Sequence, residues 1–242
     1  MSIATEPVEY CDAEVNLTGQ FVWDHTLSGK RPGILVVHGG AGLDEHAKGR
    51  ARRFADLGFV VFACDMYGDG VAGDRRRVMT RIMELRKNPA KLCQRTNAGL
   101  GVLRSHPLAD ERIAAVGYCF GGMTVLELAR SGADLAGVVS VHGSLDTSLP
   151  LQPGTVRAKM LVCHGALDPH VPMTQVTTFV EEMNRVGADY QVIVYGGAMH
   201  GFTHESGSQT PGVAYNAIVD HRSSIAIRSF FGELFAAPNK TW

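Results

Sequence analysis

Short apolar runs rich in β-branched residues alternate along the chain with polar loops and stretches of helical spacing. Continuous apolar runs of this length are typical of strands buried on both faces, and their alternation with helices predicts a mostly parallel sheet covered on both sides. The predicted strands lie at 33–37, 59–63, 112–117, 135–141, 159–163 and 191–195, and the predicted helices at 44–57, 75–104 (two helices divided near Asn88 and Pro89), 120–130, 172–186 and 215–235.

The N-terminal segment has a different pattern, with residues 8–15 and 20–24 predicting antiparallel edge strands joined around residues 16–19. The sequence contains no repeat, low-complexity tract or long linker, so we expect one α/β domain over residues 1–242. In a sheet of this kind, functional groups gather in the loops beyond the carboxyl ends of the strands. The loops that follow the predicted strands are therefore the expected location of the functional residues.

Composition and charge narrow the class of protein. Hydrophobic residues make up 45% of the chain and charged residues 19%, which is typical of a globular domain. The formal net charge is −1 and the longest basic block is Arg75-Arg76-Arg77, so neither a nucleic acid nor a membrane is expected as a partner. The first thirty residues lack a basic start followed by an apolar run, so we expect no secretory signal and a cytoplasmic location.

The five cysteines are an odd number at scattered positions. A disulfide framework favours an even number, and a zinc site favours closely spaced pairs, so neither a disulfide framework nor a bound metal is expected. Most of these cysteines fit the role of small apolar packing residues. Cys119 has a different context.

Cys119 follows the apolar run 113–116 and precedes a predicted helix, with Gly117 two residues before it and Gly121 two residues after it. This is the nucleophile-elbow pattern of the α/β-hydrolase fold, with cysteine in the position of the usual serine. The turn from strand to helix is so sharp that a Cβ at either glycine would clash. The helix N-terminus favours a thiolate. The alternative, a packing cysteine in a glycine-rich turn, leaves Gly121-Gly122 unexplained.

An elbow nucleophile on this fold requires an acid and then a histidine later in the chain. Asp168 follows the predicted strand 159–163 and fits the acid, although an aspartate there also fits a helix cap. His200 follows the predicted strand 191–195 and fits the base. His204 is the rival base, whereas chain order removes His38 and His164.

The loop after the first core strand reads His-Gly-Gly-Ala-Gly over residues 38–42. Esterases use a glycine-rich loop at this place to supply the second N–H of an oxyanion hole. The N–H groups of Gly40 and Phe120 are therefore the predicted pair. A phosphate-binding role is rejected because the loop lacks the lysine and hydroxyl of a P-loop and the spacing of a dinucleotide motif.

Cysteine in the elbow, Asp168 and His200 at these intervals, and Asp65-Met66-Tyr67-Gly68 after a strand resemble the dienelactone hydrolase family over nearly the whole chain. The resemblance implies a Cys-His-Asp triad, an α/β-hydrolase domain without a lid domain, no metal or other cofactor, and hydrolysis of small lactones or esters. In that family, Asp65 and Tyr67 correspond to positions in a loop beside the pocket.

The chain departs from the family pattern at two positions. The family places a glutamate directly after the first core strand, where this chain has Gly39. It also places a carboxylate-binding arginine four residues after the catalytic histidine, where this chain has His204. We therefore treat Gly39, His204 and Tyr67 as substrate-binding candidates, with an arginine of 75–81 as an alternative source of positive charge. Dienelactone itself does not follow as the substrate.

The expected function is hydrolysis of small lactones or activated esters through a thioester on Cys119. A carbon–carbon hydrolase or acyltransferase on the same fold is an alternative. A non-catalytic redox-sensing or ligand-binding protein is another. The expected partner is a small-molecule ester or lactone, and the oligomeric state stays open.

Overall fold

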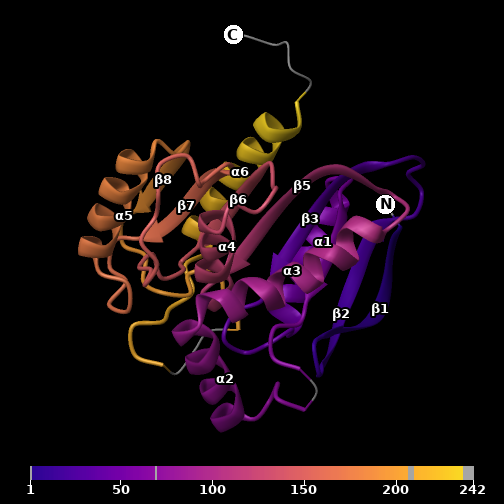
Figure 1. Cartoon of the computed structure of the whole chain (residues 1–242), viewed down its shortest axis with the longest axis horizontal. Helices are drawn as coiled ribbons and strands as arrows, with labels where there is room; N and C mark the ends of the chain where they lie inside the picture. The colour runs from indigo at the N-terminus through magenta and orange to yellow at the C-terminus, as the bar shows by residue number, and fades with distance from the viewer. Residues whose placement is uncertain (1, 69, 207–209, 237–242) are drawn as a thin grey trace.

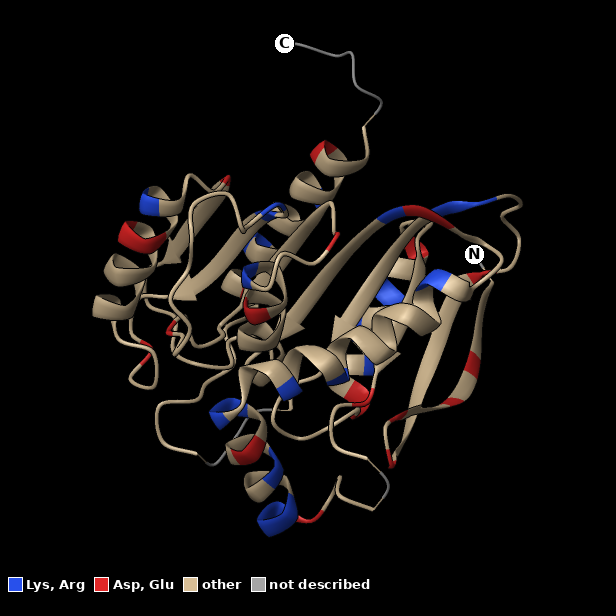
Figure 2. Cartoon of the chain, viewed as in Figure 1, with Lys and Arg blue, Asp and Glu red and all other residues tan. Residues whose placement is uncertain are grey.

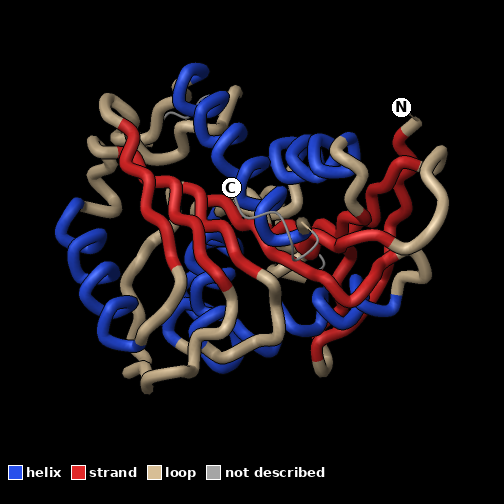
Figure 3. The backbone as a smooth tube through the Cα atoms, turned by 90° about the horizontal axis from the view of Figure 1, so that it is seen from above, coloured by secondary structure: helices blue, strands red, loops and turns tan. Residues whose placement is uncertain are grey.

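The computed structural model describes residues 2–68, 70–206 and 210–236, and its centre is one eight-stranded sheet (Figures 1 and 3). The strand order is β1-β2-β4-β3-β5-β6-β7-β8. Every pairing from β4 to β8 is parallel, whereas β1 and β2 are antiparallel to each other and β2 is antiparallel to β4. The strands are β1 (Ile3–Asp12), β2 (Val15–Asp24), β3 (Arg31–Val37), β4 (Val60–Cys64), β5 (Ala109–Tyr118), β6 (Gly137–Val141), β7 (Lys159–Gly165) and β8 (Tyr190–Tyr195).

Helices cover both faces of the sheet, as Figure 3 shows, which confirms the predicted α/β fold with antiparallel N-terminal strands. One apolar layer joins the sheet to α3, α4 and α5, and the other joins it to α1 and α6. The strands between these layers are buried on both faces, which is why they read as continuous apolar runs. The helices are α1 (Glu45–Asp56), α2 (Arg75–Lys87), α3 (Pro89–Ser105), α4 (Phe120–Arg130), α5 (Met173–Val186) and α6 (Ala217–Phe235).

The predicted division between α2 and α3 is confirmed. Asn88 ends α2 and also caps α3, because its side chain accepts a hydrogen bond from the N–H of Lys91 at 3.1 Å. Pro89 occupies the first turn of α3, where its missing N–H costs nothing. The pair therefore ends one helix and starts the next.

The predicted position of the N-terminal turn is wrong. The chain reverses at Ala13, which has φ of 51°, and residues 16–19 lie inside β2. Gly19 suggested a turn, but its role is packing: a Cβ there would lie 2.3 Å from the Phe62 ring of the neighbouring strand. Glycine at this position therefore leaves room for the Phe62 ring to lie against β2. A contact with another strand cannot be predicted from the local sequence pattern.

Charged residues of both signs are spread over the helices, strands and loops, as the colours of Figure 2 show. No helix in the described part of the chain is long and apolar enough to cross a membrane. The apolar residues of the helices instead cover the sheet.

Candidate active site

The turn between β5 and α4 has the geometry of a nucleophile elbow. Cys119 adopts φ of 54° and ψ of −112°, a conformation that costs energy for any residue with a Cβ. A Cβ on Gly117 would lie 2.0 Å from the carbonyl oxygen of Gly121, and a Cβ on Gly121 would lie 2.2 Å from that of Val37. Strand and helix therefore approach so closely that glycine is required on both sides of the cysteine.

Three predicted catalytic side chains meet at the carboxyl edge of the sheet. His200 Nε2 lies 3.0 Å from Cys119 Sγ, and His200 Nδ1 lies 2.7 Å from Asp168 Oδ2. The other carboxylate oxygen of Asp168 accepts the backbone N–H groups of His170 at 2.8 Å and Val171 at 3.0 Å. Asp168 therefore orders the turn before α5 and orients the imidazole. It is not the cap of that helix, because the capping residue of α5 is Pro172 and no side chain accepts a hydrogen bond there.

The electrostatics of this group favour an ion pair. Burial opposes a charge on His200, but its hydrogen bonds with Asp168 and Cys119 outweigh burial and raise the pKa of the imidazole to about 10. Burial also opposes a thiolate on Cys119, yet His200 and nearby backbone N–H groups lower the pKa of the thiol. Both shifts favour an imidazolium beside a thiolate.

The predicted oxyanion donors face the sulfur. Backbone hydrogen bonds from Phe120 and Gly40 are among the interactions that lower the pKa of Cys119. The loop that carries Gly40 is supported from the protein interior, because the hydroxyl of Tyr67 donates to the carbonyls of Gly39 at 3.3 Å and Gly40 at 3.2 Å. Tyr67 is fully buried. Its position supports the loop, and Asp65 in turn accepts the N–H of Tyr67 at 2.8 Å.

A histidine that chain order does not single out holds the elbow from behind. His142, directly after β6, has φ of 42° and is fully buried. Its Nδ1 lies 3.1 Å from the backbone N of Cys119 and its Nε2 lies 2.8 Å from the hydroxyl of Thr203. Because Nδ1 accepts the cysteine N–H, the ring proton sits on Nε2 and donates to Thr203. The only sequence signal for this role is a histidine at a strand end.

His204 lies beside the site and does not reach the sulfur by any hydrogen bond. Its ring stacks on His46 with centroids 4.0 Å apart. Burial lowers the pKa of His204, with nearby Asp44 opposing this shift and His200 adding to it. Burial, together with the neighbouring His204 and Arg50, lowers the pKa of His46 to about 3. Both rings are therefore neutral near pH 7.

The remaining substrate-binding candidates lie close by. A Cβ on Gly39 would meet Cys119 Cβ at 3.7 Å and His204 Cε1 at 3.8 Å, so this position borders both residues at ordinary contact distance. Two of the arginines of α2 are engaged elsewhere: Arg77 donates to the carbonyl of Gly70, and Arg81 pairs with Glu84 at 2.8 Å. The structure therefore brings His204 and Gly39, but neither of these two arginines, to the nucleophile.

The other four cysteines are free thiols outside this group. Burial raises the pKa of Cys93 to about 11 and that of Cys163 to about 12, and it also raises the pKa of Cys64. Cys11 is exposed on β1. Among the residues that the structure describes, no three histidine, cysteine or acidic side chains are grouped so that they could hold a metal ion.

Fold and elbow together define an α/β-hydrolase. The chain belongs to the dienelactone hydrolase family, whose family model matches residues 21–235, and it is an ester hydrolase of that family. It is 37% identical over 152 residues to the uncharacterised protein K02A2.1 of Caenorhabditis elegans, covering 60% of this chain and 96% of that protein. A putative carboxymethylenebutenolidase of Methylorubrum extorquens is 28% identical, covering 72% of this chain and 64% of that protein.

Two solved structures are similar over almost the full length. One is a protein called m3DLH, with 37% identity and a TM-score of 0.92, covering 98% of this chain and 100% of that chain. The other is a dienelactone hydrolase-like promiscuous phosphotriesterase, P91, from metagenomic libraries, with 39% identity, the same TM-score and the same coverage. These similarities extend over the whole sheet and both helical layers.

Proposed function

We propose that this protein hydrolyses small, uncharged activated esters and lactones with Cys119 as nucleophile, His200 as acid and base, and Asp168 as the residue that orients His200. The observation that carries the proposal is the continuous contact from Asp168 Oδ2 through the His200 ring to Cys119 Sγ, with distances of 2.7 and 3.0 Å. A strained elbow that presents the sulfur at the N-terminus of α4 supports it.

The reaction starts from the thiolate of Cys119 and the imidazolium of His200. The thiolate attacks the ester carbonyl, and the resulting oxyanion accepts hydrogen bonds from the N–H groups of Gly40 and Phe120. His200 gives its proton to the departing alkoxide as the C–O bond breaks, which leaves a thioester and a neutral imidazole. His200 then takes a proton from water, the hydroxide attacks the thioester, and collapse of this second intermediate restores the thiolate and releases the acid.

The neutral surroundings of the nucleophile favour an uncharged acyl group. His204 and His46 are neutral near pH 7 because their pKa values are lowered. Arg50 is buried and makes a bidentate salt bridge to Asp220 at 2.7 and 2.8 Å. No described cation other than His200 itself contacts the sulfur, so a carboxylate on the substrate lacks a partner. A thiolate is also expelled more easily than an alkoxide, which favours substrates with good leaving groups.

The test is hydrolysis of p-nitrophenyl butyrate by the wild type, Cys119→Ala and Cys119→Ser, with Cys11→Ala as the matched control. We expect the butyryl group on Cys119 in acid-quenched wild type by peptide mass spectrometry, loss of turnover in both Cys119 variants, and normal turnover in the control. Turnover by Cys119→Ala at the wild-type rate would show that another group attacks. Incorporation of ¹⁸O from labelled water into butyrate separates hydrolysis from acyl transfer.

A second candidate is hydrolysis of phosphotriesters, because P91 is described as a promiscuous phosphotriesterase and shares 39% identity and a TM-score of 0.92 with this chain. The same thiolate attacks phosphorus, the P–O bond to the leaving aryloxide breaks, and the N–H groups of Gly40 and Phe120 face the developing negative charge. Water deprotonated by His200 then attacks phosphorus, and cleavage of the P–S bond restores the thiolate and releases the phosphodiester. Paraoxon turnover that disappears in Cys119→Ala and remains in Cys11→Ala is the expected result. Absence of wild-type turnover would exclude this activity.

A further inference from the structure

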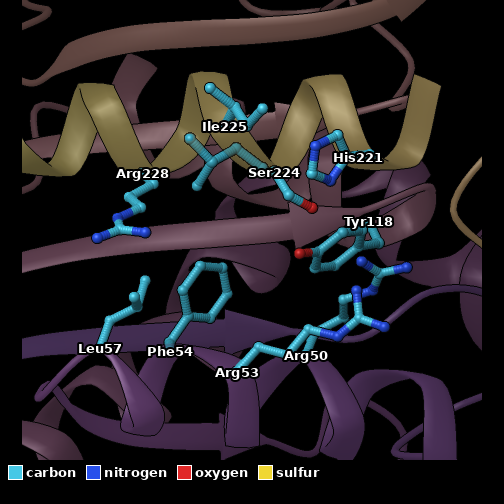
Figure 4. Close-up of a pocket in the computed structure, with 10 residues that line it drawn as sticks. Arg50, Arg53, Phe54, Leu57, Tyr118, His221, Ser224, Ile225 and Arg228 are labelled. Carbon is cyan, nitrogen blue, oxygen red and sulfur yellow. The ribbon is translucent and has the colours of Figure 1, made fainter. Parts of the chain in front are cut away.

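A pocket lies between α1 and α6, on the sheet face opposite α3, α4 and α5 (Figure 4). The two helices are fixed at both ends: Arg50 pairs with Asp220 at one end, and the rings of Phe54 and Phe231 are 5.6 Å apart at the other. The space between has a volume of about 250 Å³. This is slightly smaller than pockets that hold drug-sized molecules, which span roughly 300–1,000 Å³.

The base of the pocket holds the hydroxyl of a tyrosine whose ring is buried. Tyr118, the last residue of β5, is 2% exposed, and its hydroxyl makes no hydrogen bond to any described residue. Figure 4 shows this hydroxyl pointing into the space between the helices, which Ser224 of α6 also lines. Ser224 likewise makes no hydrogen bond within the described part of the chain. Both residues line the pocket, so these hydroxyl protons are available to a bound acceptor oxygen.

The charged groups of the pocket are cations. Arg50, Arg53 and Arg228 contribute to its lining, and no acidic side chain in the described part of the chain does. Asp220 compensates Arg50, and Glu205 compensates Arg53 at 2.6 Å. Arg228 has no ion pair or hydrogen bond with any described residue, so its charge and its five N–H donors are free for a ligand.

The other part of the lining is apolar. Phe54 is 7% exposed, whereas Leu57 on α1 and Ile225 on α6 are 42% and 56% exposed. Leu57 and Ile225 therefore leave hydrocarbon surface in contact with water, beside the unpaired guanidinium of Arg228. A ligand that covers this surface and also supplies acceptor oxygens satisfies both parts of the pocket.

We infer that the pocket between α1 and α6 binds a small carboxylate with an apolar body. A carboxylate only accepts hydrogen bonds, and the free groups here include the Arg228 guanidinium and the hydroxyls of Tyr118 and Ser224. The apolar body packs on Phe54 and Leu57. This site is separate from the catalytic group, because Cys119, His200 and Asp168 do not line it.

The test is isothermal titration of 4-phenylbutyrate into protein whose Cys119 has been alkylated by iodoacetamide, so that the catalytic site is blocked. We expect binding to persist after alkylation and to weaken about tenfold or more in Arg228→Gln, because a hydrogen bond to a charged group contributes about 1.5–3 kcal/mol. Tyr118→Phe removes only the hydroxyl and is expected to weaken binding about threefold to tenfold.

Arg222→Gln is the matched control, because Arg222 is an exposed arginine of α6 that does not line the pocket. Binding to this variant is expected to equal that of the wild type, and 4-phenylbutyramide, which lacks the charge, is expected to bind more weakly. Equal losses in Arg228→Gln and Arg222→Gln overturn the proposal. No binding by the alkylated protein also overturns it, and so does a dimer that Ile225→Ser abolishes, because a second copy then covers the pocket.

Discussion

The histidine at the nucleophile and the histidines behind it have opposite protonation states, although their rings are close together. The rings of His200 and His142 are 5.4 Å apart. Burial disfavours a charge on both, but His200 has the carboxylate of Asp168 and the thiolate of Cys119 as partners, and its pKa rises to about 10. Burial and three neighbouring histidines, the first of them His200, lower the pKa of His142 well below its usual value.

The difference shows that charged partners, and not burial alone, decide which imidazole holds a proton. His142 and His46 share the hydroxyl of Thr203 at 2.8 and 3.1 Å, and among the residues that the structure describes neither has a carboxylate in hydrogen-bond contact. Because His200 is the protonated ring at the sulfur, the acid that protonates the leaving group is already in place. The neutral rings of His142 and His46 pack and form hydrogen bonds there, and they add no positive charge to the site.

Removing the charged ring is expected to give the largest effect. His200→Ala should lower kcat for p-nitrophenyl butyrate by about 10³-fold or more, because base and nucleophile act as a unit. His204→Ala is the matched control and should change mainly KM. Steady-state kinetics of the two variants checks this. If His204→Ala is the inactive variant, the base has been assigned to the wrong ring.

Removing the carboxylate of Asp168, the partner of His200, is expected to give the next largest loss of activity. Asp168→Asn should lower kcat by about 10²-fold, because Asn cannot stabilise the imidazolium and permits the wrong tautomer. In the wild type, activity should fall as the pH rises through about 10, where His200 loses the proton that the leaving group needs. In Asp168→Asn that loss should occur at lower pH, since the pKa of His200 is no longer raised by the carboxylate. An unchanged alkaline limb in the pH–rate profile would contradict the assignment.

Placing a charge among the neutral rings should give a smaller effect. His204→Arg adds a permanent cation beside Gly39 and Cys119, so it should favour an ester whose acyl group carries a carboxylate by about tenfold, because a charge-assisted hydrogen bond to a carboxylate contributes roughly 1.5–3 kcal/mol. The measurement is the ratio of kcat/KM for mono-p-nitrophenyl succinate and p-nitrophenyl butyrate. His204→Gln is the control for size. Equal ratios in the two variants would indicate that position 204 does not contact the acyl group.

Much of the fold and the catalytic group can be predicted from the sequence, because both depend on local pattern and chain order. The buried strands appear in the sequence as apolar runs. Gly117 and Gly121 mark the turn around Cys119, because a Cβ at either glycine would clash with the backbone. The N-terminal turn was misplaced because Gly19 makes room for Phe62 of another strand. The role of His142 and the pocket at Tyr118 depend on segments distant in sequence, which no local pattern reports.

The pH dependence of alkylation at Cys119 tests the ion pair most directly. Iodoacetamide reacts with the thiolate, so the labelling rate follows its population. Because His200 and backbone N–H groups lower the pKa of Cys119, we expect its labelling rate to rise, and to reach its plateau, at lower pH than that of an ordinary thiol. In Asp168→Asn the plateau should begin at higher pH. A wild-type rate that is low at neutral pH and rises through about 9, as for an ordinary thiol, would contradict the resting thiolate–imidazolium pair.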